Sequence, residues 1–278
     1  KPLLAKVYKP RGDGPFPALI DLHGGAWCMA DRNTDKVRHE FLASHGCTVV
    51  SLDFRMAKEG AYPIALQDIN YAVRWTKLHA KELKTRPDLV GISGQSSGGH
   101  LAMLAAMRPR DARYTAIPLP AGSPALDATV KFAVLSWPVI NPLSRYRHAK
   151  RNAALPTPPE WPAGIIDKHH QFWGDEANMA EGNPMLMLER GDEIAEIADW
   201  LGLSRAAIEA ISLRRCRPIS PRGEGDDVKR RPGSGPKRRA VSCVAVDCAL
   251  DDTLLAIDAL RATRSPDGGP NESTGETA

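Results

Sequence analysis

The sequence contains no histidine after position 170, although its 278 residues include eight histidines. It has no apolar run near the roughly 20 residues that a membrane-spanning helix needs, so we expect no membrane span. The amino-terminal stretch KPLLAKVYKP lacks the long apolar core of a signal peptide. A G-x-G-x-x-G pattern is missing and no lysine follows the glycine-rich turns, which disfavours dinucleotide sites and P-loops.

The cysteines are few and do not form a recognisable set. There are five, an odd number, without a C-x-x-C pair, and no histidine follows Cys216, Cys243 or Cys248 to complete a zinc site. We therefore predict reduced thiols in a cytoplasmic protein, with neither a metal nor another cofactor. The formal net charge of +4 indicates little about partners.

Apolar runs alternate with helix-like segments through the first half of the chain. An edge strand is predicted over 3–8, and buried strands over 16–22, 47–54, 88–93 and 130–140. Between them, helical spacing predicts helices over 34–44, 63–83 and 98–107. This alternation is typical of βαβ units, so the expected fold class is α/β, with a doubly wound, mostly parallel sheet.

The rest of the chain differs in composition. Residues 141–187 are rich in proline, tryptophan and histidine without a clear period, and we interpret them as a lid or an irregular insertion. Residues 191–278 form an atypical tail: a helix pair (192–211), a basic Pro/Gly-rich linker (214–239), a short strand and helix (240–262) and a disordered end. We therefore divide the chain into a domain over 1–190 and this tail.

The stretch GQSSGG places glycines two residues before and two residues after Ser96. Between a buried strand and a helix, this spacing is typical of a nucleophile elbow, a tight turn that exposes the serine hydroxyl. Side chains at Gly94 or Gly98 would collide with the neighbouring strand and helix. The alternative is a Gly/Ser turn without chemistry.

The stretch HGGAW directly follows the first buried strand. Acyl transfer passes through an oxyanion that needs aligned hydrogen-bond donors, which are usually backbone N–H groups. Gly24, Gly25 and Ala26 could supply two donors, and Ser97 a third. A plain turn is the alternative.

With these motifs, the chain resembles the hormone-sensitive-lipase-like carboxylesterases of the α/β-hydrolase fold. HGGAW, LDFRMAKEGAYPIALQD and GQSSGGHLA match three ordered motifs of that family, and the resemblance covers about residues 3–188. It implies that Ser96 is the nucleophile, that Gly24, Gly25, Ala26 and Ser97 form the oxyanion hole, and that the substrate is a small ester with a short acyl chain.

The chain also departs from that family. Ala26 replaces a glycine, Gln95 replaces an acidic residue, and the amino-terminal cap helices are missing. Aromatic residues of the later segment would line the acyl or alcohol pocket, or would belong to the core: Trp137, Trp161, Phe172 and Trp173.

The family places its acid and then its histidine after the later strands. No histidine stands there, and His100 would point along its helix away from Ser96. His169 and His170 are the weak candidates for the base, and Asp247 and Asp251, with Asp252 beside them, for the acid. Without its histidine, the acid orients nothing.

Three explanations fit the incomplete triad. The sequence from about Gly191 onward is a frameshifted or chimeric end; a histidine from the insertion substitutes; or the protein binds without turnover. We predict a serine carboxylic-ester hydrolase, impaired by the missing late histidine.

The alternative is a non-catalytic hydrolase-like binding protein, whose tail could form a nucleic-acid-binding helix-turn-helix. We interpret the tail rather as amphipathic helices and a solvated linker, so nucleic acid is not the expected partner. The domain would lack its usual carboxyl-terminal strands, and the resulting unpaired sheet edge favours a homodimer.

Overall fold

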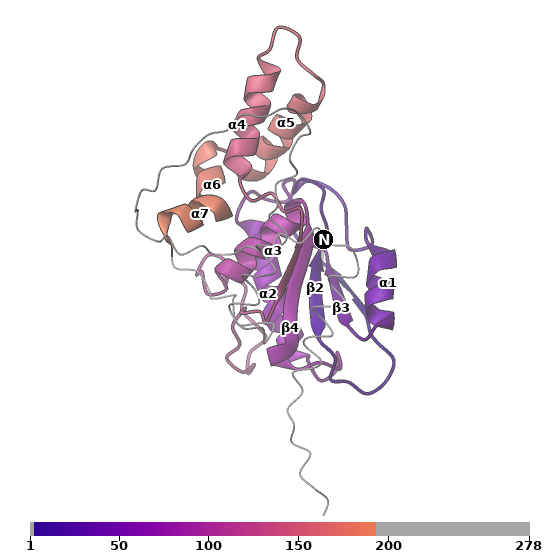
Figure 1. Ribbon diagram of the computed structural model, residues 1–278. Coiled ribbons are helices and arrows are strands. Elements are labelled where there is room, and N and C mark those ends of the chain that lie inside the picture. The colour runs from indigo at the N-terminus through magenta and orange to yellow at the C-terminus, as the bar shows by residue number, and fades with distance from the viewer. Residues whose placement is uncertain (1–2, 193–278) are drawn as a thin grey trace, which may run out of the picture.

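The computed structural model describes residues 3–192, which fold around a five-stranded sheet (Figure 1). The strand order is β1-β3-β2-β4-β5, and the bounds are β1 (Ala5–Tyr8), β2 (Ala18–Leu22), β3 (Thr48–Leu52), β4 (Val90–Gln95) and β5 (Ala133–Ser136). β3 pairs in parallel with β2, β2 with β4, and β4 with β5. At the edge of the sheet, β1 pairs antiparallel with β3. The predicted doubly wound, mostly parallel sheet and its edge strand are confirmed.

Three helices cover the two faces of this sheet. α1 (Lys36–Ser44) lies on one face, and α2 (Ile64–Leu78) and α3 (Ser97–Met107) lie on the other (Figure 1). A single 3₁₀ turn, η1 (Pro87–Leu89), leads into β4. Every residue of α3 is buried. A helix that is apolar on every side must be covered on every side, which places α3 in the centre of the molecule.

The alternation of side chains along β2 builds two cores. Ile20 and Leu22 belong to the larger cluster, which includes residues of α2 and α3, whereas Leu19 belongs to a smaller cluster with Leu42 of α1. Successive side chains of a strand point to opposite faces. Because both faces of β2 are covered, the strand is a nearly continuous apolar run, interrupted only by the ion-paired Asp21.

The prediction of an irregular segment over 141–187 is wrong. This segment forms four helices: α4 (Pro142–Ala153), α5 (Trp161–Trp173), α6 (Glu176–Glu181) and α7 (Pro184–Arg190). The side chains of Asn141, Asp175 and Asn183 cap the starts of α4, α6 and α7. Prolines stand in the first two positions of α4, α5 and α7, where proline starts a helix instead of breaking it.

α4 follows the carboxyl end of β5, so α4 and α5 project beyond this end of the sheet (Figure 1). Within residues 3–192, β5 has β4 as its one strand partner, and dimerisation through its other edge stays a prediction. None of the helices in this range is both long enough and apolar enough to cross a membrane. The proposed domain boundary at 190/191 also stays a prediction, since most of the tail lies outside the described residues.

Candidate active site

Ser96 occupies a sharp bend between β4 and α3. Its backbone has φ 54° and ψ −118°, a left-handed conformation that is rare for a residue with a side chain. The bend is fixed on both sides: the Ser96 N–H donates to the Ser136 carbonyl (3.0 Å), and the Val139 N–H donates to the Ser96 carbonyl (3.2 Å). The side chain is half-buried at the carboxyl edge of the sheet, as the elbow motif predicts.

The flanking glycines are required by steric contact. A β-carbon on Gly98 would lie 2.2 Å from the Leu22 carbonyl oxygen and 2.3 Å from that of His23. One on Gly94 would lie 2.5 Å from the carbonyl group of Gly98. Contacts this short with backbone atoms cannot be relieved by a rotamer change. The predicted collisions at both positions are therefore confirmed.

The HGGAW loop lies directly against this bend. A β-carbon on Gly24 would be 3.5 Å from Ser96 Cβ, and three consecutive residues have positive φ: Gly25 (105°), Ala26 (52°) and Trp27 (63°). Within residues 3–192, the N–H groups of Gly25, Ala26 and Ser97 have no hydrogen-bond partner. Ser97 is the first residue of α3, so its N–H belongs to the positive end of that helix.

The region that contains these motifs is similar to known proteins. The BD-FAE family model matches residues 6–136. The carboxylic ester hydrolase LipN of Mycobacterium tuberculosis is 36% identical over 123 residues, 42% of this chain and 32% of LipN. Over these residues the chain is similar to known carboxylic ester hydrolases, in agreement with the resemblance that its motifs carry.

Two further similar proteins match more of the chain. Lipase 2 of Moraxella sp. is 29% identical over 192 residues, 63% of this chain and 43% of that lipase. The carboxylesterase EstE1, cloned from a metagenomic library, superposes with a TM-score of 0.51 at 24% identity, over 66% of this chain and 59% of EstE1. That superposition shows the α/β-hydrolase fold. The chain spans less than half the length of LipN and of Lipase 2.

One departure from the carboxylesterase motif has a direct structural explanation. Gln95, which stands where the family has an acidic residue, donates from its Nε2 to the Asp35 carboxylate at 2.8 Å. A carboxylate at position 95 would face another carboxylate. The amide at 95 and the acid at 35 therefore form a matched pair behind the nucleophile elbow.

The two histidines predicted as weak base candidates lie on α5. The Nδ1 of His169 is 2.7 Å from the Ile165 carbonyl and its ring is buried against Trp27. The Nε2 of His170 is 2.6 Å from the Tyr146 hydroxyl. Neither ring hydrogen-bonds with Ser96, so the structure does not bring this pair together with the nucleophile. Their assignment as base stays a prediction.

His100 points away from Ser96, as expected, and is held by two hydrogen bonds. Its Nδ1 is 3.2 Å from the Trp27 Nε1 and its Nε2 is 2.9 Å from the Gly182 carbonyl. Burial lowers the pKa of His100 to about 4; the bond to Gly182 opposes this shift and the nearby His169 adds to it. Burial likewise lowers the pKa of His169 to about 4, so both rings are neutral at neutral pH.

The predicted acids Asp247 and Asp251, with Asp252, lie outside the described residues, as do Cys216, Cys243 and Cys248. Of the four aromatic residues whose role the sequence left open, two belong to the core, and the pocket role of the other two stays a prediction. Phe172 and Trp173 are fully buried core residues, whereas Trp137 and Trp161 are 59% and 45% exposed.

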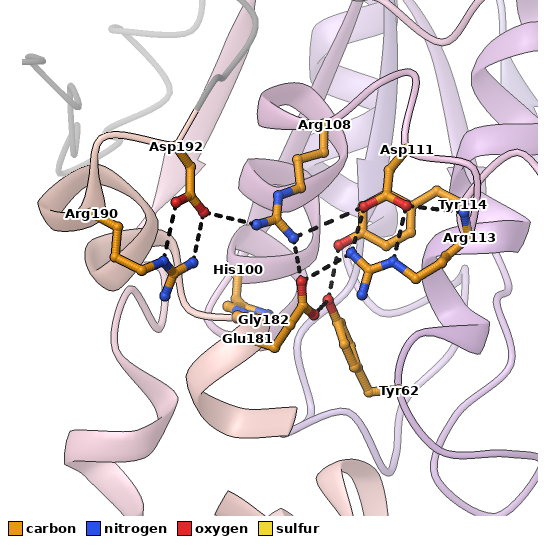
Figure 2. A network of polar contacts seen from close by, with 10 residues as sticks. All are labelled: Tyr62, His100, Arg108, Asp111, Arg113, Tyr114, Glu181, Gly182, Arg190 and Asp192. Atoms are coloured by element: carbon orange, nitrogen blue, oxygen red, sulfur yellow. Dashed lines mark hydrogen bonds and ion pairs between the residues drawn. The ribbon is translucent and has the colours of Figure 1, made fainter. Parts of the chain in front are cut away.

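The sequence did not predict a polar cluster near the carboxyl end of α3 (Figure 2). The Glu181 carboxylate accepts hydrogen bonds from Arg108 (2.5 Å), Arg113 (2.9 Å) and the Tyr62 hydroxyl. Burial tends to raise the pKa of Glu181, but the hydrogen bonds from Arg113, Tyr62 and Arg108 outweigh it and hold the pKa below its usual value. These residues are 68–119 positions apart from Glu181 in the sequence, so no local pattern could have joined them.

One cluster within residues 3–192 has metal-ligand side chains close together: Asp21, Asp35 and His39. The Asp21 carboxylate, however, already accepts from Arg38 (2.5 Å), His39 (2.7 Å) and the Ser93 hydroxyl. Burial would raise the pKa of Asp21, but Arg38 and His39 hold it well below its usual range. The arrangement is a buried ion pair that joins α1 to the sheet.

Proposed function

We propose that this protein is a serine carboxylic-ester hydrolase that forms an acyl-enzyme on Ser96. The observation that carries this proposal is the strained bend at Ser96, with Gly24 close beside it. Strained backbone persists where the surrounding structure enforces it, and it is concentrated at active sites. The relatives' names, all carboxylic ester hydrolases or lipases, support the same chemistry.

In this mechanism the Ser96 hydroxyl attacks the ester carbonyl and the alcohol leaves, after which water releases the acid. The oxyanion hole consists of backbone N–H groups from the HGGAW loop (Gly24, Gly25 and Ala26) together with the N–H of Ser97. The amino end of α3 adds its dipole to that stabilisation. The substrate we propose is a small-molecule ester with a short acyl chain, acted on in the cytoplasm.

The proposed base is a histidine of α5. His169 and His170 are the candidates among the described residues, and Asp247 or Asp251 would supply the acid. Replacing each histidine in turn by asparagine tests them. A loss of kcat in only one variant, without a fall in Tm, identifies the base; unchanged kcat in both excludes the pair.

A second candidate function is binding without turnover. It is favoured because, within residues 3–192, no imidazole hydrogen-bonds with the Ser96 hydroxyl. A nucleic-acid-binding tail would belong to this alternative. Salt-dependent DNA binding would support that tail, and no binding at low salt would exclude it.

Hydrolysis of p-nitrophenyl acetate and butyrate discriminates between these functions. The parent, Ser96→Ala and the control Ser144→Ala, an exposed serine on α4, should be compared. We expect loss of activity only in Ser96→Ala, and an acyl adduct on the parent by intact mass. Equal rates for the parent and Ser96→Ala would eliminate the nucleophile assignment.

A further inference from the structure

Two hydrogen bonds through His100 connect the HGGAW loop to the corner between α6 and α7. Indole nitrogen can only donate, so the Trp27 Nε1–H donates to His100 Nδ1. The other nitrogen, Nε2, therefore carries the proton of the neutral ring and donates to the Gly182 carbonyl. His100 is completely buried and Trp27 is 1% exposed, so water does not compete for either bond.

Trp27 is the last residue of the strained loop that presents the proposed oxyanion donors. Its own φ is 63°, and its carbonyl accepts from the Ala57 N–H at 3.1 Å. The indole stacks on Phe172, with ring centroids 5.4 Å apart. Each left-handed residue costs on the order of 1–3 kcal/mol unless its surroundings enforce it, so the anchoring of the indole stabilises the loop.

The far end of this connection is itself fixed. Gly182 follows Glu181, whose carboxylate binds Arg108, Arg113 and Tyr62 (Figure 2). A β-carbon on Gly182 would lie 2.5 Å from the Trp173 ring, so the chain is tightly enclosed at this point. The Gly182 carbonyl is thus a rigid acceptor for His100.

His100 also stands one helical turn after Ser96 on α3, where its N–H donates to the Ser96 carbonyl at 3.0 Å. The serine is therefore the N-cap of the helix that carries the ring holding Trp27. We infer that His100 is a positioning residue, which fixes the donors of Gly25 and Ala26 relative to Ser96 through Trp27. This inference rests on the proposed function for its catalytic consequence, but not for its geometry.

Four variants test it. His100→Leu and Trp27→Phe each remove the shared hydrogen bond while leaving an apolar side chain. His100→Gln retains one acceptor and one donor. Trp173→Phe is the matched control: this buried ring lies 5.4 Å from His100, but its Nε1 has no hydrogen-bond partner among the described residues.

The first readout is the backbone amide spectrum of Gly24, Gly25 and Ala26. We expect these resonances to shift in His100→Leu and Trp27→Phe, but to stay near the parental positions in Trp173→Phe and His100→Gln. Unshifted resonances in the two test variants, or equal shifts in the control, would overturn the inference whatever the activity.

The second readout is ester hydrolysis. Misplacement by about 1 Å can cost on the order of 100-fold in rate, so kcat should fall by about 10- to 100-fold in the two test variants, with little change in KM. Their double variant should fall no further than either single one. If the amide resonances shift but kcat is unchanged in the two test variants, the catalytic consequence is overturned. A parent no faster than Ser96→Ala would instead contradict the proposed function and leave the geometric result standing.

Discussion

Gly24 and Ser96 lie close together just beyond the ends of two neighbouring parallel strands, so that a β-carbon on Gly24 would lie 3.5 Å from Ser96 Cβ. They approach each other because Leu22, at the end of β2, pairs with Gly94, near the end of β4. Two loops 72 residues apart in the sequence thereby meet at one edge of the sheet.

Gly98→Ala should destabilise the protein severely. The added carbon would meet two backbone oxygens at 2.2 and 2.3 Å, and overpacking of this kind costs about 1–3 kcal/mol or more. Gly164→Ala is the control, since a β-carbon at Gly164 on α5 has open space and alanine favours a helix. Urea unfolding of both variants tests this, and equal midpoints would contradict it.

Ser96→Gly should stabilise the fold while abolishing hydrolysis. Glycine adopts φ 54° without the steric cost that serine meets. Its greater entropy in the unfolded state offsets part of this gain, and we expect a net stabilisation of about 1 kcal/mol. Ser144→Gly, in the regular helix α4, should instead lose stability. If both variants are destabilised equally, the bend at Ser96 stores no strain.

Gln95→Glu should weaken the elbow. It replaces the amide that donates to Asp35 by a carboxylate, so two like charges would stand about one hydrogen bond apart. We expect a loss of about 1 kcal/mol at neutral pH, which the second change Asp35→Asn relieves. Additive effects of the two substitutions, measured by thermal unfolding, would contradict this pairing.

Glu181 should make stability sensitive to acid. Its pKa in the folded protein lies below the ordinary 4.5, so its contribution is complete above that pH and is lost as the pH falls through the lowered value. The Glu181 side chain is 36% exposed, so solvent screens these bonds, and Glu181→Gln should cost about 1 kcal/mol at pH 7 and progressively less below pH 4.5. Asp88→Asn, at an exposed ion pair with Arg86, is the control and should cost little. A deficit for Glu181→Gln that is constant with pH would contradict the assignment.

Local patterns were sufficient where the chain's own spacing carries the physics. The apolar runs predicted β2, β3 and β4, since strands buried on both faces are mostly apolar. The spacing around Ser96 predicted its bend, because only glycine fits beside it. By contrast, prolines at the starts of α4, α5 and α7 were misread as signs of irregular structure.

The sequence by itself determined the sheet, the serine elbow and the loop beside it, because each depends on residues close together in the chain. Only the tertiary structure decided the neutral form of His100, the core role of Phe172 and Trp173, and the ion pairs of Glu181. Those depend on contacts between segments far apart in the sequence, where burial and hydrogen-bond geometry are set by how the helices pack.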